Sequence, residues 1–168
     1  MPLTPTQKLN VRKSMTDFCK RAEANQWHWH YSQQRPFHGF GVKPEYQHVN
    51  DCSGYVGLVF NWAMHQAGTY MADPLGYHYN GYGYTGSMVE WLNSHGRKVV
   101  EANGYLVGDI AINGHSYSST NHTFICKKAG SAKTSLWSSH GNENAPDQVT
   151  LHYHPTPLVG VWRHPALL

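Results

Sequence analysis

The hydrophobic pattern of this chain changes once, near residue 96, and that change limits the folds it can adopt. Before it, apolar residues recur at helical spacing over residues 5–24, 52–66 and 87–94. After it come short runs rich in β-branched and aromatic residues, separated by turn residues. Helices followed by antiparallel strands predict an α+β fold, with a helical part over about 1–96 and a sheet part over about 97–168.

Local signals predict where the helices begin and end. Thr4 and Gln7 form a capping-box pattern at the start of the first helix. Gly68 follows the last apolar position of the second helix and predicts its end. Ser87 and Glu90 form another capping-box pattern, so the third helix is expected to begin at Ser87.

The second part of the chain predicts an antiparallel meander. Its expected strands are 98–102, 109–112, 122–127, 134–138, 149–153 and 158–162. Everything before residue 96 is expected to be helix or loop. The stretch 69–86 is rich in Tyr and Gly and has no clear period, and a loop of that length in a compact domain is often functional.

Length and composition narrow the class of protein further. A chain of 168 residues with 40% hydrophobic residues and no internal repeat is expected to form one domain and to act as a monomer. A net charge of +3 is too small for a duplex nucleic acid partner, but it suits an anionic polymer. No apolar run is long enough to insert into a membrane, and the N-terminus lacks the features of a signal peptide. Three cysteines are an odd number, so at least one thiol is expected to be free.

Cys52 is the first candidate for chemistry, because it falls at the start of the second helix. Free backbone N–H groups and the positive end of the helix dipole favour a thiolate there, so a nucleophile with a depressed pKa is expected. The neighbouring Asp51 is expected to cap the helix. Cys19 and Cys126 fall at apolar positions and are expected to be buried.

His122 is the candidate base for this thiol. Strand alternation places His122 and Phe124 on one face, and Phe124 is expected in the core. If that face packs on the second helix, His122 meets Cys52. A third polar residue would orient the imidazole, and His140 is the candidate, with Asn142 as the alternative.

Several segments, taken in order, carry a family resemblance. They are Tyr31-Ser32-Gln33, Asp51-Cys52-Ser53-Gly54, Asp73-Pro74, the loop from Tyr79 to Gly86, Gly108-Asp109, and Ser139 to Pro146. Together they resemble the NlpC/P60 cysteine peptidases, which have a papain-like fold. The resemblance is closer to the peptidase domains of endolysins from phages of actinobacteria, and it covers roughly residues 29–162. The interval between Cys52 and His122 is longer than in compact bacterial members.

The resemblance implies hydrolysis of an amide in the peptide stem or cross-bridge of peptidoglycan, without a cofactor. Cys52 matches the nucleophile of the family, His122 the base and then acid, and His140 the residue that orients the ring. Tyr31 matches a tyrosine near the oxyanion, through its Y-S-x-x-R context, and Tyr46 is a weaker candidate for that place. Residues assigned to the oxyanion or substrate are therefore Tyr31, Asp51, Ser53, Tyr82 and Tyr84.

Endolysins also imply a biological setting, namely degradation of the host cell wall in phage lysis. With no signal peptide, the protein is expected in the host cytoplasm until a holin-like partner releases it to the wall. A virion-associated enzyme is the alternative. Which bond is cut is left open, as is a separate wall-targeting domain.

Three rival functions are considered: a wall-binding module without catalysis, a thiol acyltransferase and a zinc hydrolase. A module of the same fold could bind the wall without cutting it, stacking its aromatic loop on glycan. A thiol acyltransferase would pass the acyl group to an amine instead of water. The pairs His28/His30 and His152/His154 share the spacing of metal ligands on a strand, but no further ligand motif completes them, so no metal is expected.

Overall fold

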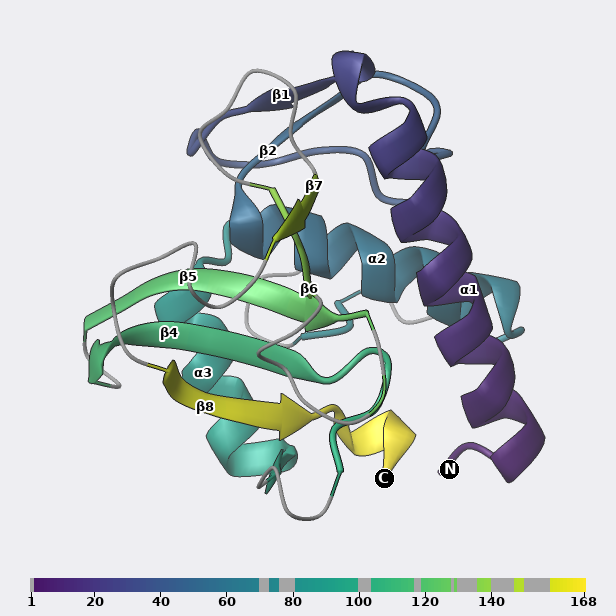
Figure 1. Ribbon diagram of the computed structural model, residues 1–168, viewed down its shortest axis with the longest axis vertical. Helices are drawn as coiled ribbons and strands as arrows, with labels where there is room; N and C mark the ends of the chain where they lie inside the picture. The colour runs from purple at the N-terminus through teal and green to yellow at the C-terminus, as the bar shows by residue number, and fades with distance from the viewer. Residues whose placement is uncertain are drawn as a thin grey trace.

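The computed structural model describes residues 2–69, 73–75, 81–99, 104–116, 119–127, 129, 136–139, 147–149 and 158–168. Within them the chain forms three α-helices and two sheets, the α+β class that the sequence predicts (Figure 1). The elements are α1 (Pro5–Ala24), η1 (Gln26–His28), β1 (Trp29–Tyr31), β2 (His48–Asn50), α2 (Cys52–Gln66), α3 (Thr85–His95), β3 (Arg97–Val99), β4 (Ile110–Ser116), β5 (Ser119–Cys126), β6 (Leu136–Ser138), β7 (Asp147–Val149), β8 (Leu158–Arg163) and η4 (Pro165–Leu167). None of these helices combines the length and the hydrophobicity of a membrane span.

The signals predicted for the first two helices are confirmed. Thr4 and Gln7 form the capping box at the start of α1, and Gly68, with a φ of +73°, follows the end of α2. The third helix begins two residues earlier than expected, at Thr85. The hydroxyl of Ser87 bonds back to the N–H and C=O of Tyr84, so Tyr84 is the N-cap and Ser87 already lies inside the first turn.

The larger sheet is antiparallel with the order β3-β8-β4-β5-β6-β7, so the simple meander predicted above was wrong. The last strand of the chain lies between β3 and β4. Val161 and Trp162 are consecutive residues of this strand, β8, and are buried in different hydrophobic clusters on the two faces of the sheet. A strand that is apolar on both faces is stable only where both faces are covered, between other strands of the sheet. β4 also continues through Asn113 and Gly114, where a turn was expected, because a bulge absorbs the change of register.

A second, two-stranded sheet corrects the expectation that only helix and loop precede residue 96. β1 and β2 pair in parallel, with Trp29 opposite His48 and Tyr31 opposite Asn50. Strands of three residues are too short to show alternation in a sequence. Their pairing places Tyr31 beside the segment that leads into α2.

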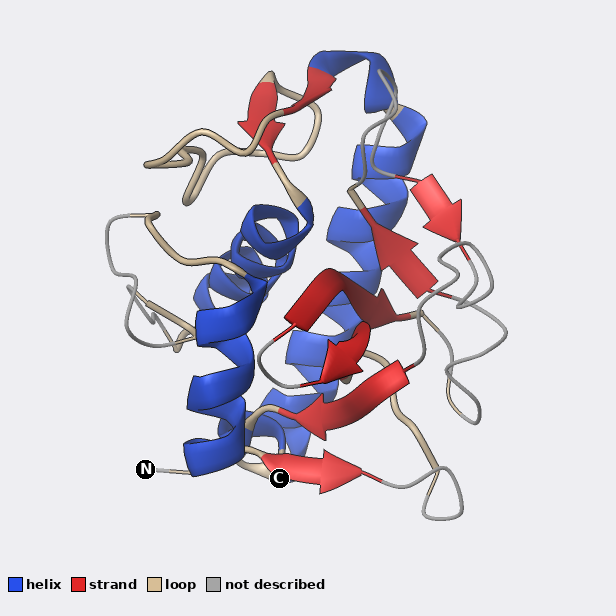
Figure 2. Ribbon diagram, turned by 90° about the vertical axis from the view of Figure 1, so that its left-hand side faces the viewer, coloured by secondary structure: helices blue, strands red, loops and turns tan. Residues whose placement is uncertain are grey.

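Helices cover one face of the larger sheet (Figure 2). Ile110, Ile112 and Ile125 join the side chains of the helices in the main core, whereas Phe124 and Cys126 belong to a second cluster. The face of β5 that carries Phe124 therefore does not pack on the second helix, so the condition stated above for a contact between His122 and Cys52 is not met. Both faces of β5 are buried, so strand alternation in the sequence gives two apolar rows of residues. It does not tell which of the two rows packs on α2.

His164 anchors the C-terminal end of the chain. Its ring is fully buried between Phe60 and Trp91, accepts the N–H of Ala166 and donates to the carbonyl of Pro74. Burial lowers the pKa of His164 to about 4. The folded protein therefore holds this imidazole neutral.

A depressed histidine pKa makes the fold sensitive to acid. Stability from neutral His164 is complete above the unfolded pKa of about 6.5 and is lost as the pH falls toward the folded value. We expect the free energy of unfolding in urea to fall by about 2 kcal/mol more between pH 7.5 and 5 in the wild type than in His164→Gln. Burial also lowers the pKa of His48, which both proteins share. Equal pH slopes in the two proteins would contradict this assignment.

Candidate active site

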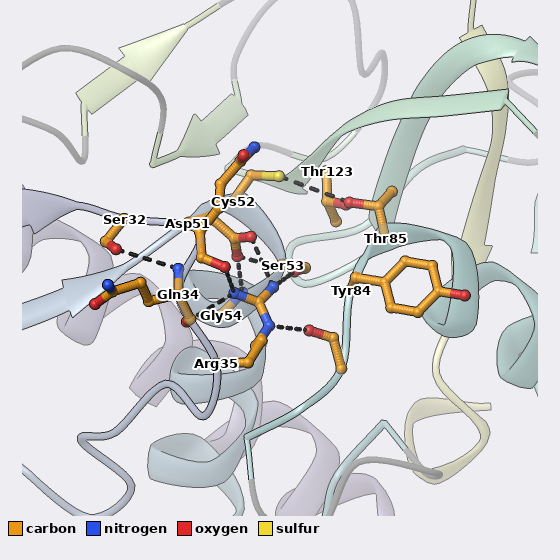
Figure 3. A network of polar contacts seen from close by, with 12 residues as sticks. Ser32, Gln34, Arg35, Asp51, Cys52, Ser53, Gly54, Tyr84, Thr85 and Thr123 are labelled. Carbon is orange, nitrogen blue, oxygen red and sulfur yellow. Dashed lines mark hydrogen bonds and ion pairs between the residues drawn. The ribbon is translucent and has the colours of Figure 1, made fainter.

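The thiol of Cys52 lies where α2, α3 and β5 meet (Figure 3). Cys52 is the first residue of α2 and only 5% exposed. Its sulfur is 3.7 Å from the hydroxyl oxygen of Thr85 and also receives hydrogen bonds from the backbone N–H groups of Thr123 and Ser53. Two backbone donors and one side-chain hydroxyl therefore surround one sulfur atom.

The structure corrects the expected pKa of this thiol. Burial, and then the negative charge of Asp51, raise the pKa of Cys52 to about 11, against the opposing hydrogen bonds from Thr85 and from the N–H groups of Thr123 and Ser53. The sequence suggested a depressed pKa because it reveals the helix start but not how deeply that start is buried. In this arrangement the resting thiol is protonated at neutral pH.

Asp51 caps α2, as predicted. One carboxylate oxygen accepts the N–H of Gly54 and the hydroxyl of Ser53, both at 2.9 Å, and the other forms a 2.7 Å ion pair with Arg35. Arg35 also donates to Ser53 and, from its Nε at 2.7 Å, to the carbonyl of Gly83 (Figure 3). The guanidinium thus ties the loop before β2, the start of α2 and the segment before α3 together.

The described part of the Tyr/Gly-rich loop is held close to this network. The N–H of Phe37 donates to the carbonyl of Gly81 at 3.0 Å. Gly81 has a φ of +76°, and a Cβ there would lie 2.2 Å from the Phe37 carbonyl oxygen, so only glycine fits. Tyr82 and Tyr84, expected to contact substrate, are 55% and 59% exposed. Both side chains are exposed beside the anchored segment.

Tyr31, the predicted oxyanion residue, lies opposite Asn50, two residues before Cys52. Burial raises the pKa of Tyr31 first, followed by the negative charge of Cys52, and Gln33 donates to its hydroxyl at 3.3 Å. The place of Tyr31 on β1 puts it at the strand that pairs with the segment leading into α2. Tyr46, the weaker candidate, is exposed and lines a separate groove with Trp27.

His122 is buried on β5, directly before the residue whose N–H reaches the thiol. Its ring packs edge-to-face on Phe124, with centroids 4.6 Å apart, and its Nε2 lies 2.7 Å from the hydroxyl of Ser138. That hydroxyl also donates to the carbonyl of Thr123 at 2.9 Å. A hydroxyl has one proton, so while Ser138 donates to the Thr123 carbonyl it can only accept from His122, in the tautomer with its proton on Nε2.

Ser138 is a contact of His122 that sequence reasoning missed. It lies at the end of β6, and Leu136 opposite Cys126 sets the register that brings β6 against β5. The signal was present, because a polar residue closes an otherwise apolar strand. His140 and Asn142, the predicted orienting residues, lie outside the described residues.

Metal ligands do not gather in the described part of the chain, where no three His, Cys, Asp or Glu side chains are placed to share an ion. Nδ1 of His28 instead contacts the backbone carbonyl of Glu45. His152 and His154 lie outside the described residues.

The helices, the antiparallel sheet and the thiol at the start of α2 define the class of fold, which is the NlpC/P60-type α+β fold. Solved structures similar to the chain include NlpC2 from Trichomonas vaginalis, with a TM-score of 0.50 and 13% identity over 89% of this chain and 48% of that one. NlpC1 from the same organism has a TM-score of 0.44 and 14% identity over 86% of this chain and 44% of that one.

The similarity to NlpC2 establishes the fold alone. The chain spans about half the length of NlpC2. No family model and no curated protein matches the chain.

Proposed function

We propose that this protein is a cysteine peptidase or amidase that hydrolyses an amide bond in the peptide part of peptidoglycan. One observation carries the proposal: a buried thiol at the first residue of α2 is surrounded by two backbone N–H donors and the hydroxyl of Thr85. The NlpC/P60-type fold supports the same chemistry. A sulfur surrounded by donors suits a step in which negative charge forms there.

The proposed reaction has two halves. The ring of His122, which packs on Phe124, would have to turn toward α2 to take the proton of Cys52 as the sulfur attacks the amide carbon. The carbonyl electrons move to the oxygen, where Tyr31 and the backbone N–H of Cys52 donate. The C–N bond then breaks, and the leaving amine takes the proton from His122. Water, deprotonated by His122, attacks the thioester, and a carboxylate and the free thiol result.

The raised pKa of Cys52 gives this mechanism its order of events. A thiol with a pKa of about 11 does not supply a standing thiolate at neutral pH. Proton transfer to His122 therefore accompanies attack on the substrate instead of preceding it. Ser138 would hold the imidazole so that Nδ1 faces this task, with His140 the further candidate.

The proposal also includes the wall of the substrate cleft and the biological role of the protein. Exposed Tyr82 and Tyr84 would form one wall of the substrate cleft, since aromatic rings pack on peptide and sugar surfaces. A phage endolysin that degrades the host wall, acts as a monomer and leaves the cytoplasm with a holin is the biological role that the sequence resemblance supports. A virion-associated enzyme would use the same site.

One experiment tests the chemistry directly. Actinobacterial peptidoglycan is incubated with untreated protein and with protein alkylated at Cys52, and the released fragments are identified by mass spectrometry. We expect new amino and carboxyl ends with the untreated protein alone, and the fragments name the bond. New ends of equal yield after alkylation would contradict a cysteine mechanism.

The protonated resting thiol favours one rival, a non-catalytic wall-binding module of the same fold. That rival predicts intact wall with protein bound to it, whether or not Cys52 is alkylated. An acyltransferase predicts amide products when a primary amine is added to the digest.

A further inference from the structure

Thr85 places a side-chain hydroxyl on the sulfur of Cys52, and no sequence motif pointed to it. We propose that Thr85 is a further catalytic residue, whose hydroxyl donates a hydrogen bond to the Cys52 sulfur and stabilises the thiolate as it forms. The inference deepens the proposed function and rests on it, because it concerns the same sulfur atom.

A directed pair of hydrogen bonds supports the role. The hydroxyl of Thr123 donates to the hydroxyl of Thr85 at 3.0 Å, and the oxygen of Thr85 is 3.7 Å from the sulfur of Cys52 (Figure 3). A hydroxyl can accept and donate at once, but it has a single proton. Thr85 accepts from Thr123 and so retains its own proton for the sulfur.

All three members of this relay are buried. Thr85 is 9% exposed, Thr123 is fully buried and Cys52 is 5% exposed. Hydrogen bonds polarise one another more strongly when water is excluded, and a donor to a developing charge gains most. The relay therefore acts where the sulfur has little water to stabilise its charge.

Among the described residues, the hydroxyl of Thr85 does not cap α3. A Thr near a helix start often serves as a cap, but Tyr84 is the N-cap of α3 and Ser87 supplies the side-chain hydroxyl that bonds its backbone. The contacts of the Thr85 hydroxyl instead lead outward, to β5 and to α2. The hydroxyl therefore bridges β5 and the start of α2.

The direction of the effect follows from the charges around the thiol. Burial and Asp51 raise the pKa of Cys52, and the hydrogen bond from Thr85 is the largest influence that lowers it. Removal of the hydroxyl leaves the N–H groups of Thr123 and Ser53 as the remaining donors. The thiolate should then become harder to form.

The test measures thiolate formation without a substrate. Modification of Cys52 by iodoacetamide is followed by peptide mass spectrometry from pH 7 to about 12.5 in the wild type, Thr85→Val and Thr85→Ser, so that the series extends past a midpoint of about 11. Valine keeps the branched shape and removes the hydroxyl. We expect Thr85→Val to shift the midpoint upward, with about three- to tenfold less thiolate at a fixed pH, and Thr85→Ser to stay near the wild type.

A matched control separates chemistry from helix stability. Ser87→Ala removes a hydroxyl from the same turn of α3, and that hydroxyl bonds the Tyr84 backbone. Its midpoint should equal that of the wild type. A shift as large as that of Thr85→Val would overturn the proposal, as would an unchanged midpoint in Thr85→Val.

Thr123→Val, at the far end of the relay, should shift the midpoint in the same direction by less. No shift there would contradict the directed relay even where Thr85→Val fails to fold.

The two proposals can fail separately. A protein that leaves peptidoglycan intact but shows the Thr85→Val shift contradicts the proposed function and retains the contact. A protein that cuts the wall through Cys52 without that shift contradicts the role of Thr85 alone. On wall substrate, the shift should accompany a lower kcat with little change in KM, because the hydroxyl acts on the sulfur and not on substrate binding.

Discussion

Replacing Cys52 with serine should reduce hydrolysis of peptidoglycan by about a thousandfold or more, with the fold unchanged. The serine oxygen occupies nearly the same place, beside Thr85 and the N–H groups of Ser53 and Thr123. A serine hydroxyl is a far weaker acid than a thiol, however, and His122 would have to remove its proton at a much higher cost. The measurement is the rate at which new amino ends appear in purified wall.

The control for this prediction uses another thiol of the chain. Cys19 is fully buried in the main core, and burial raises its pKa to about 12. Cys19→Ala should lose about 1 kcal/mol of stability through the small cavity and retain full activity below its unfolding temperature. Full activity in Cys52→Ser, or equal loss in both variants, would remove Cys52 from the mechanism.

Features encoded by neighbouring residues were predictable from the sequence. Thr4 and Gln7, and Asp51 with the N–H of Gly54, satisfy backbone groups within one helical turn. Such contacts depend on local spacing alone, so the starts of α1 and α2 and the position of Cys52 followed from it. Burial of Cys19 and Cys126 followed from the apolar stripes in the same way.

Features that depend on distant pairing were not predictable. The insertion of β8 between β3 and β4 joins strands far apart in the chain, and no local signal encodes it. Which face of β5 packs on α2 was decided by tertiary packing, because Phe124 and Ile125 are both fully buried. The thiol therefore meets Thr123 and Thr85, a residue type that the sequence did not single out.

The pKa of Cys52 and the contacts of Arg35 were likewise only partly predictable from the sequence. The helix start that favours a thiolate was visible, but its desolvation depends on α3 and β5 folding over it. The interaction of Arg35 with Asp51 could have been suspected, since the Y-S-x-x-R context contains that arginine. Its bond to the carbonyl of Gly83 could not, because that contact requires the loop geometry.

A buried ion pair away from the thiol should carry the largest single effect on stability. Asp109 is fully buried and receives Nε and Nη2 of Arg163 on its two oxygens, at 2.8 and 2.7 Å. The N–H of Leu106 donates to the same carboxylate at 2.8 Å. The Gly-Asp segment that resembles the NlpC/P60 peptidases thus has a structural task, joining the turn before β4 to the end of β8.

Asp109→Ala should lower the free energy of unfolding by about 3–5 kcal/mol, because it leaves the guanidinium of Arg163 largely buried without its counter-charge. Urea unfolding at pH 7 measures the change. Asp17→Ala is the matched control, since its ion pair with Arg21 is on the surface and its carboxylate is 58% exposed, and it should cost about 1 kcal/mol or less. Replacing both partners, with Asp109→Leu and Arg163→Met, should recover most of the loss, because the cost comes from the orphaned charge and not from the absent attraction. Equal stabilities of Asp109→Ala and Asp17→Ala would contradict this account of how β8 is held in the centre of the sheet.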